Sequence, residues 1–223
     1  MLVLIAAILF STTAGAAALR PLSQVEGGAS TAWPSSLVGC DDGTNLGTLI
    51  QRGDLLYGNR LQSPCAGARL RRIAFVHAGS SSPSAYRLHV RDASCNEIGV
   101  TPVRFTTATN AAPHLEEVDV ADYGWCAHGD VRVFVEPLSC PQPSDCFPAV
   151  VVDAGTGGDC AEVAVPNGGG RSCLAARTSD GRSFAFRIRA EFECSAPTCI
   201  TATRSRTWTA AKRLYDVQPA PRY

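Results

Sequence analysis

Apolar and polar residues alternate with a period of two along most of this chain, which is typical of β-strands and not of helices. The clearest alternation runs from residue 183 to residue 194. Its apolar members share one face, and they are Phe184, Phe186, Ile188, Ala190, Phe192 and Cys194. Its charged members share the other face, and they are Arg187, Arg189, Glu191 and Glu193. We predict a half-buried strand here, with its charged face in solvent.

Other segments repeat this pattern over shorter stretches, and turn-forming residues separate them. The predicted strands cover residues 46–50, 55–57, 72–76, 86–91, 117–120, 131–136 and 149–152. Clusters of glycine, proline, serine and aspartate lie between them, and Asp180-Gly181 marks the tip of a predicted hairpin at 178–183. This arrangement predicts an all-β fold, an antiparallel, jelly-roll-like β-sandwich. The one helical pattern, at 208–215, predicts a short helix in the C-terminal tail.

The N-terminus has the features of a secretory leader. An apolar run from Leu2 to Phe10 precedes small residues at 14–18 that fit a signal-peptidase site, although no lysine or arginine comes before the run. The run is shorter than the roughly 20 apolar residues that a membrane-spanning helix needs. We therefore expect a secreted protein, extracellular or periplasmic, without a membrane span. Its expected parts are a signal peptide at 1–18, an extended lead-in at 19–39, a β-sandwich domain at 40–200 and a basic tail at 201–223.

All ten cysteines lie downstream of this leader, and they are Cys40, Cys65, Cys95, Cys126, Cys140, Cys146, Cys160, Cys173, Cys194 and Cys199. In an exported chain, an even number of cysteines predicts disulfides. Zinc is the competing interpretation, but the closest cysteines lack Cys-x₂₋₄-Cys pairs in duplicate and the four histidines are scattered. The spacing favours local bridges, and we expect Cys40–Cys65, Cys95–Cys126, Cys140–Cys146, Cys160–Cys173 and Cys194–Cys199.

The net charge of the chain bears on which partners we expect it to bind. The formal net charge is zero, which does not favour non-specific binding to nucleic acid, so we expect no nucleic-acid partner. The charge is uneven, because the tail from residue 204 onward carries five basic residues against one acidic residue.

The sequence carries no recognisable catalytic motif. Neither a Gly-x-Ser-x-Gly elbow nor a His-Glu-x-x-His zinc motif is present. His77 falls in phase with Ile73 and Phe75, which favours a partly buried strand histidine over a catalytic one. A small secreted hydrolase whose site joins His77 to Asp153 is an alternative hypothesis.

Three other titratable residues give weaker signals. His89 lies on the polar face of its predicted strand, so we expect it to be exposed. Glu116 and Glu117 are adjacent in a predicted strand and point to opposite faces, so we do not expect them to act as paired carboxylates.

Two acidic loops are candidate calcium sites. One spans residues 41–44, and the other offers Asp153 and Asp159 at the ends of a glycine-rich loop. Calcium binds six to eight oxygen ligands, and a pliable loop with free carbonyls can supply some of them. Neither loop has EF-hand spacing. We therefore expect no cofactor apart from calcium as a candidate, with Asp153 and Asp159 as its metal ligands.

Four segments of the second half of the chain follow one another in a recognisable order, at 131–136, 148–153, 171–174 and 184–190. Over about 131–190 the chain thereby resembles the jelly-roll-type β-sandwich modules of secreted bacterial proteins, which accompany exported proteases or occur in surface adhesins. The resemblance implies a non-catalytic module and supplies no catalytic residue. The density of cysteines departs from that family's pattern.

Together these features predict a secreted, non-catalytic β-sandwich with a binding, surface or structural role, whose partner is a cell-surface glycan or a protein. A carbohydrate-binding module is the first alternative, because Trp33, Trp125 and Trp208 could stack on sugars. It requires at least two aromatic side chains exposed on one sheet face or loop rim. The hydrolase with an unrecognised site is the second alternative.

Overall fold

The computed structural model describes residues 19–21, 36–41, 46–49, 51–78, 82–107, 112–142, 145–153, 159–177, 181–194 and 199. These residues form antiparallel sheets packed face to face, which confirms the predicted all-β sandwich. The described part contains no α-helix and a single 3-10 turn, η1 at Ala121–Tyr123. The expected signal peptide, the helix at 208–215 and the basic tail lie outside the described residues.

The larger sheet is built around one long central strand. Its strands are β1 (Leu19–Pro21), β2 (Leu37–Val38), β3 (Leu46–Leu49), β5 (Ala68–Ala78), β9 (His114–Asp119), β10 (Cys126–Ala127), β14 (Ala149–Asp153), β17 (Ala185–Phe186) and β18 (Ile188–Glu193). Their order is β1-β3-β14-β5-β18-β2, with β9 and β10 on β5 and β17 on β14. The central strand β5 therefore connects most of this layer.

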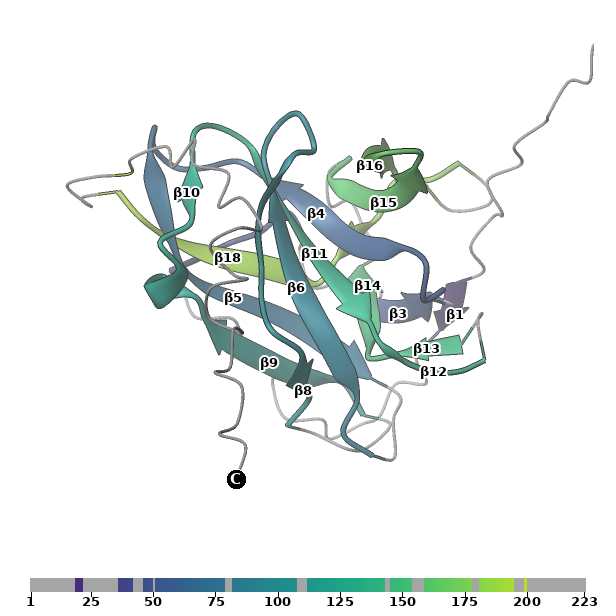
Figure 1. Cartoon of the computed structure of the whole chain (residues 1–223). Helices are drawn as coiled ribbons and strands as arrows, with labels where there is room; N and C mark the ends of the chain where they lie inside the picture. The colour runs from purple at the N-terminus through teal and green to yellow at the C-terminus, as the bar shows by residue number, and fades with distance from the viewer. Residues whose placement is uncertain are drawn as a thin grey trace, which may run out of the picture.

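The smaller sheet covers one face of the larger one. Its strands are β4 (Leu56–Leu61), β6 (Ala85–Arg91), β7 (Glu97–Val100), β8 (Arg104–Phe105), β11 (Val131–Pro137), β15 (Ala161–Asn167) and β16 (Gly170–Ala175). Their order is β16-β15-β4-β11-β6-β7, with β8 beside β6. Figure 1 shows this layer crossing in front of β5 and β18. A separate hairpin joins β12 (Ser139–Gln142) to β13 (Asp145–Phe147).

The core lies between the two sheets and follows from the alternation of the strands. Phe75 and Phe186 of the larger sheet pack with Tyr86 and Val133 of the smaller one, and all four are fully or almost fully buried. The rings of Phe75 and Tyr86 meet edge to face across the layers, with centroids 5.1 Å apart. Every second residue of each strand thus contributes to one shared core.

One polar side chain inside this core joins the two sheets. Asn59 on β4 is fully buried. Its amide donates to the carbonyls of Phe186 and Ile188, at 2.5 and 3.1 Å, and its oxygen accepts from the N–H of Phe186 at 3.0 Å. These bonds satisfy backbone groups of Phe186 and Ile188 on either side of Arg187, where the strand predicted at 183–194 breaks into β17 and β18.

The expectation of a solvated charged face on this strand is wrong at Arg187, whereas Glu191 and Glu193 farther along the same face stay partly exposed. Phe184, Phe186 and Ile188 face the core as predicted, but Arg187 is only 4% exposed on the opposite face. Asp41 supplies the counter-charge, because its carboxylate accepts two bonds from Arg189, at 3.0 and 3.1 Å, and lies 3.5 Å from Arg187. A long-range ion pair thus replaces solvent around Arg187.

Of the five expected disulfides, only Cys140–Cys146 is correct. All ten cysteines are paired, and the other bridges are Cys40–Cys160, Cys65–Cys194, Cys95–Cys173 and Cys126–Cys199. The expected pairs Cys40–Cys65, Cys95–Cys126, Cys160–Cys173 and Cys194–Cys199 are therefore wrong. The physical reason is that strand pairing, the packing of the two sheets and the curl of the smaller sheet bring together segments that lie 73 to 129 residues apart in the sequence.

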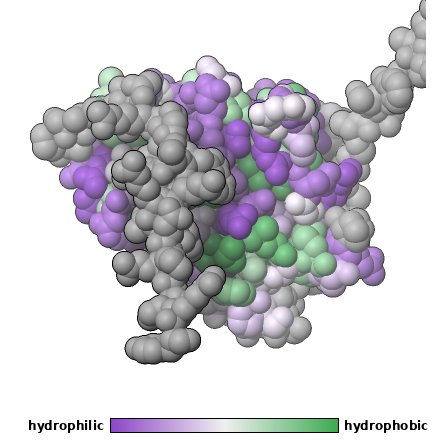
Figure 2. Space-filling view, viewed as in Figure 1, coloured by the Kyte–Doolittle hydropathy of each residue, from purple (hydrophilic) through white to green (hydrophobic). Residues whose placement is uncertain are grey.

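The smaller sheet curls at its edges. The turn between β6 and β7 is bridged to β16, at the opposite edge of the sheet, by Cys95–Cys173. Beneath this bridge, Leu56, Phe134 and Ala164 form a small second cluster with Cys173. Elsewhere the visible face combines hydrophilic areas with a hydrophobic area (Figure 2).

Candidate functional site

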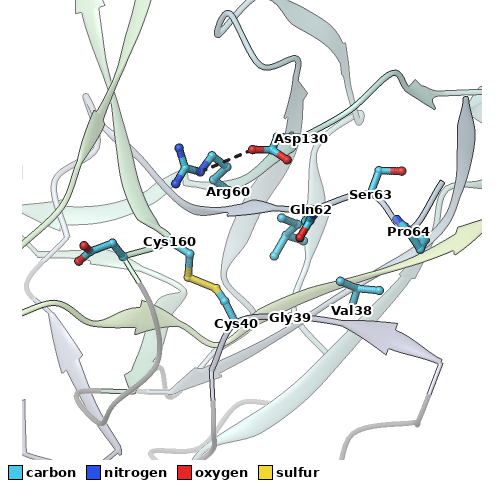
Figure 3. Close-up of a pocket in the computed structure, with 11 residues that line it drawn as sticks. Val38, Gly39, Cys40, Arg60, Gln62, Ser63, Pro64, Asp130 and Cys160 are labelled. Atoms are coloured by element: carbon cyan, nitrogen blue, oxygen red, sulfur yellow. Dashed lines mark ion pairs between the residues drawn. A yellow bond between two sulfur atoms is a disulfide. The ribbon is translucent and has the colours of Figure 1, made fainter. Parts of the chain in front are cut away.

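A cleft with a volume of about 760 Å³ opens where four separate segments meet. It is lined by the end of β2 and the residues after it, by the end of β4 and its following loop, and by the residues that precede β11 and β15. Figure 3 shows these side chains around the opening. The lining residues are Val38, Gly39, Cys40, Arg60, Leu61, Gln62, Ser63, Pro64, Asp130, Asp159 and Cys160.

A disulfide forms one wall of the cleft. Cys40 follows β2 of the larger sheet and Cys160 precedes β15 of the smaller sheet, so their bridge joins the two layers at this point. Figure 3 places the bridge below Arg60 and across from Ser63 and Pro64. The backbone N–H of Arg60 also donates a hydrogen bond to the backbone carbonyl of Cys160, at 2.8 Å. The wall is therefore fixed by both a covalent and a backbone contact.

The charged groups of the cleft surround the Arg60 side chain. The Arg60 guanidinium lies 3.9 Å from the Asp130 carboxylate, and both side chains are nearly half exposed. The pKa of Asp159 is lowered by its hydrogen bond from Ser183, then by the charge of Arg177 at 3.2 Å, and further by Arg60. The Asp159 carboxylate is thus kept ionised at neutral pH, and the carboxylates of Asp130 and Asp159 are both accessible to solvent.

The cleft is suited to holding a polar ligand. Carboxylates accept hydrogen bonds, a guanidinium donates them, and amide and hydroxyl groups such as Gln62 and Ser63 do both. Sequence reasoning identified Asp159 in another role and missed Arg60, Asp130, Gln62 and Ser63. No local pattern marks these residues, because they become neighbours only when the two sheets pack.

The two residues expected to bind calcium, Asp153 and Asp159, have different surroundings. Asp153 ends β14 and is fully buried, and its charge acts on Arg187. Asp159 is exposed at the cleft, where Arg177 and Ser183 contact its carboxylate. Residues 154–158 between them lie outside the described part, so calcium binding stays a prediction. Within the described ranges, no three histidine, cysteine or acidic side chains already surround one metal position.

His77 faces a carboxylate other than the one expected. Its Nε2 lies 3.7 Å from Glu116 on the neighbouring strand β9. Asp153 lies on the opposite side of the larger sheet, since Val152 before it and His77 both face the smaller sheet, as Phe75 does. The structure therefore does not bring together the two residues of the hydrolase hypothesis.

His89 is not exposed, contrary to expectation. Its side chain is 11% exposed, with Nδ1 3.0 Å from Glu97 and Nε2 3.1 Å from Glu136. Arg91 pairs with the same Glu97 carboxylate at 3.1 Å. The outer face of the smaller sheet therefore carries a partly enclosed charge network in place of a freely solvated histidine.

One of the three tryptophans belongs to the described part. Trp125 is 7% exposed and packs into the core, and the ring of Tyr123 stacks on it at 4.7 Å. Tyr123 is 39% exposed. Trp33 and Trp208 lie outside the described residues, and the exposed aromatic side chains of the described part include Tyr123 on η1 and Phe105 on β8.

Comparison of this chain with protein-family models, with curated proteins and with solved structures finds no match. Among the helices of the described part, none is long and apolar enough to cross a membrane.

Proposed function

We propose that this protein is a secreted, non-catalytic β-sandwich that binds a polar, hydroxyl-rich ligand in the Arg60 cleft, with cell-surface glycans as the ligand class. The cleft is the observation that carries this proposal. Its volume lies within the range of small-ligand sites, and its charged and hydrogen-bonding side chains converge on one opening. Sugars are recognised through such directional bonds to their hydroxyl groups.

The five disulfides support the secreted part of the proposal. Bridges of this kind form and persist in oxidising compartments, and the apolar leader agrees with export. They also favour binding, since a wall held by Cys40–Cys160 needs little ordering when a ligand enters.

The proposal is tested with an array of bacterial and host cell-surface glycans, followed by titration of the best-bound glycan. We expect Arg60→Ala and Asp130→Asn to weaken binding by about tenfold or more, because loss of a hydrogen bond to a charged group removes roughly 1.5–3 kcal/mol. Their exposed ion pair contributes little to stability, so folding should be preserved.

Arg52→Ala is the matched control, because Arg52 is also an exposed arginine paired with an aspartate, Asp54, but it lies outside the cleft. It should bind like the wild type. Equal loss in Arg52→Ala and Arg60→Ala, or an array without any signal, would contradict the proposed function.

A further inference from the structure

A second group of polar side chains lies on strands β5 and β9, away from the Arg60 cleft. His77 pairs with His114 across the two strands, and Phe75 pairs with Glu116 in the same register. Residues two apart on a strand share a face, so His77, His114 and Glu116 all project from the face that carries Phe75. The rings of His77 and His114 lie 6.4 Å apart between centroids and are inclined by 38°.

The Nε2 atom of His77 has no hydrogen-bond partner although it is fully buried. Buried polar atoms nearly always have a partner, and an unsatisfied one costs about 1–3 kcal/mol. The nearest carboxylate oxygen, on Glu116, is 3.7 Å away, which is too long for a hydrogen bond. Two ligands at 2.0–2.1 Å from one tetrahedral zinc ion are separated by about 3.4 Å, so this spacing is close to that of two metal ligands.

The Glu116 carboxylate is held in place by another residue. The backbone N–H and the hydroxyl of Thr107 both donate to its Oε2, at 2.9 and 2.8 Å. Metal-binding carboxylates are commonly oriented by hydrogen bonds of this kind.

We propose that His77, His114 and Glu116 bind one divalent transition-metal ion, with zinc as the best match. Two imidazoles and one carboxylate suit zinc, copper or nickel better than calcium, which prefers oxygen ligands. His77 and Glu116 are nearly in position, and rotation of the His114 side chain completes the set. Three protein ligands leave a fourth position for water. Thr107 is a positioning residue for Glu116.

The test uses the full chain with its disulfides intact and without a histidine tag, stripped of metal and titrated with ZnCl₂ by calorimetry. We expect one ion per chain and a rise in the melting temperature on binding. His77→Gln and His114→Gln should abolish saturable binding. Thr107→Val should weaken it by about 10- to 100-fold, as loss of an outer hydrogen bond to a ligand does. His128→Gln, at an exposed histidine elsewhere, should bind like the wild type.

Electron paramagnetic resonance of the wild-type protein with Cu²⁺ gives a second readout that does not depend on the folding of a variant. Hyperfine coupling to two imidazole nitrogens is expected. The proposal is overturned by the absence of saturable zinc binding, by binding that His128→Gln weakens as much as His77→Gln, or by a copper spectrum without nitrogen coupling. These results are independent of glycan binding at the Arg60 cleft.

Discussion

At the scale of single residues, His89 shows how a strand position that is polar by pattern becomes a buried charge. Glu97 and Glu136 face its two ring nitrogens at 3.0 and 3.1 Å, and ionised carboxylates only accept hydrogen bonds. Both nitrogens must therefore carry protons for both bonds to form. Burial disfavours the charged ring, but the hydrogen bonds that it donates to Glu136 and Glu97 outweigh burial and raise the pKa of His89 above 6.5.

This arrangement predicts that the protein loses stability as the pH rises above 6.5. A raised pKa in the folded state means that the contribution of His89 is fully present below pH 6.5 and is lost as the pH rises through the folded value. We expect the free energy of unfolding of the wild type to fall across that window in urea titrations. His89→Gln should flatten this slope, whereas His128→Gln should keep it. An unchanged slope in His89→Gln would refute the assignment.

In acidic solution, the two carboxylates of the same cluster lose their contribution to stability as the pH falls. His89 holds the pKa values of Glu97 and Glu136 below their ordinary range, in each case chiefly through its hydrogen bond. Their contribution is present above about pH 4.5 and is lost as the pH falls through the lowered values. The cluster as a whole is therefore most stabilising between these two windows.

At the scale of elements, the junction between β17 and β18 depends on Asn59 of the facing sheet. We predict that Asn59→Ala lowers the free energy of unfolding by on the order of 3 kcal/mol, because it leaves the N–H of Phe186 and two carbonyls without partners. Chemical denaturation measures this change. Asn167→Ala removes an exposed asparagine of the β15–β16 turn and should cost far less. An equal loss of unfolding free energy in the two variants would show that the hydrogen bonds of Asn59 add no stability.

The strands themselves could be predicted from the sequence where alternation is regular, as at Phe184, Phe186 and Ile188. What could not be predicted is the environment of the other face. Arg187 is charged, which by local pattern indicates solvent, but Asp41 neutralises it from 146 residues earlier in the chain. Alternation reports only which residues share a face, and burial of that face depends on segments distant in the sequence.

The same limit explains the disulfides and the cleft. Cys140–Cys146 could be predicted because a short hairpin brings its two cysteines together locally. The partner of Cys40 could not, since Cys160 approaches it only through the packing of two sheets. Arg60 and Asp130 are likewise 70 residues apart and carry no shared motif.

At the scale of the whole molecule, four of the five disulfides join segments that are distant in the sequence, and only Cys140–Cys146 is local. Cys40–Cys160 joins the two sheets at the cleft, and Cys65–Cys194 ties the loop after β4 to the end of β18. Cys95–Cys173 connects two edges of the smaller sheet. Bridges that close long loops restrict the unfolded chain most, which suits a durable extracellular protein. They also fix the Arg60 cleft without any bound ligand.

The most direct test of the proposed binding role is a nuclear magnetic resonance titration of the ¹⁵N-labelled protein with the best-bound glycan of the array. We predict saturable shifts of the backbone amides of Gln62, Ser63, Asp130 and Cys160, which line the cleft. The amides of the β12–β13 hairpin should stay unchanged. Shifts confined to the surroundings of Tyr123, with none at the cleft, would contradict binding at Arg60.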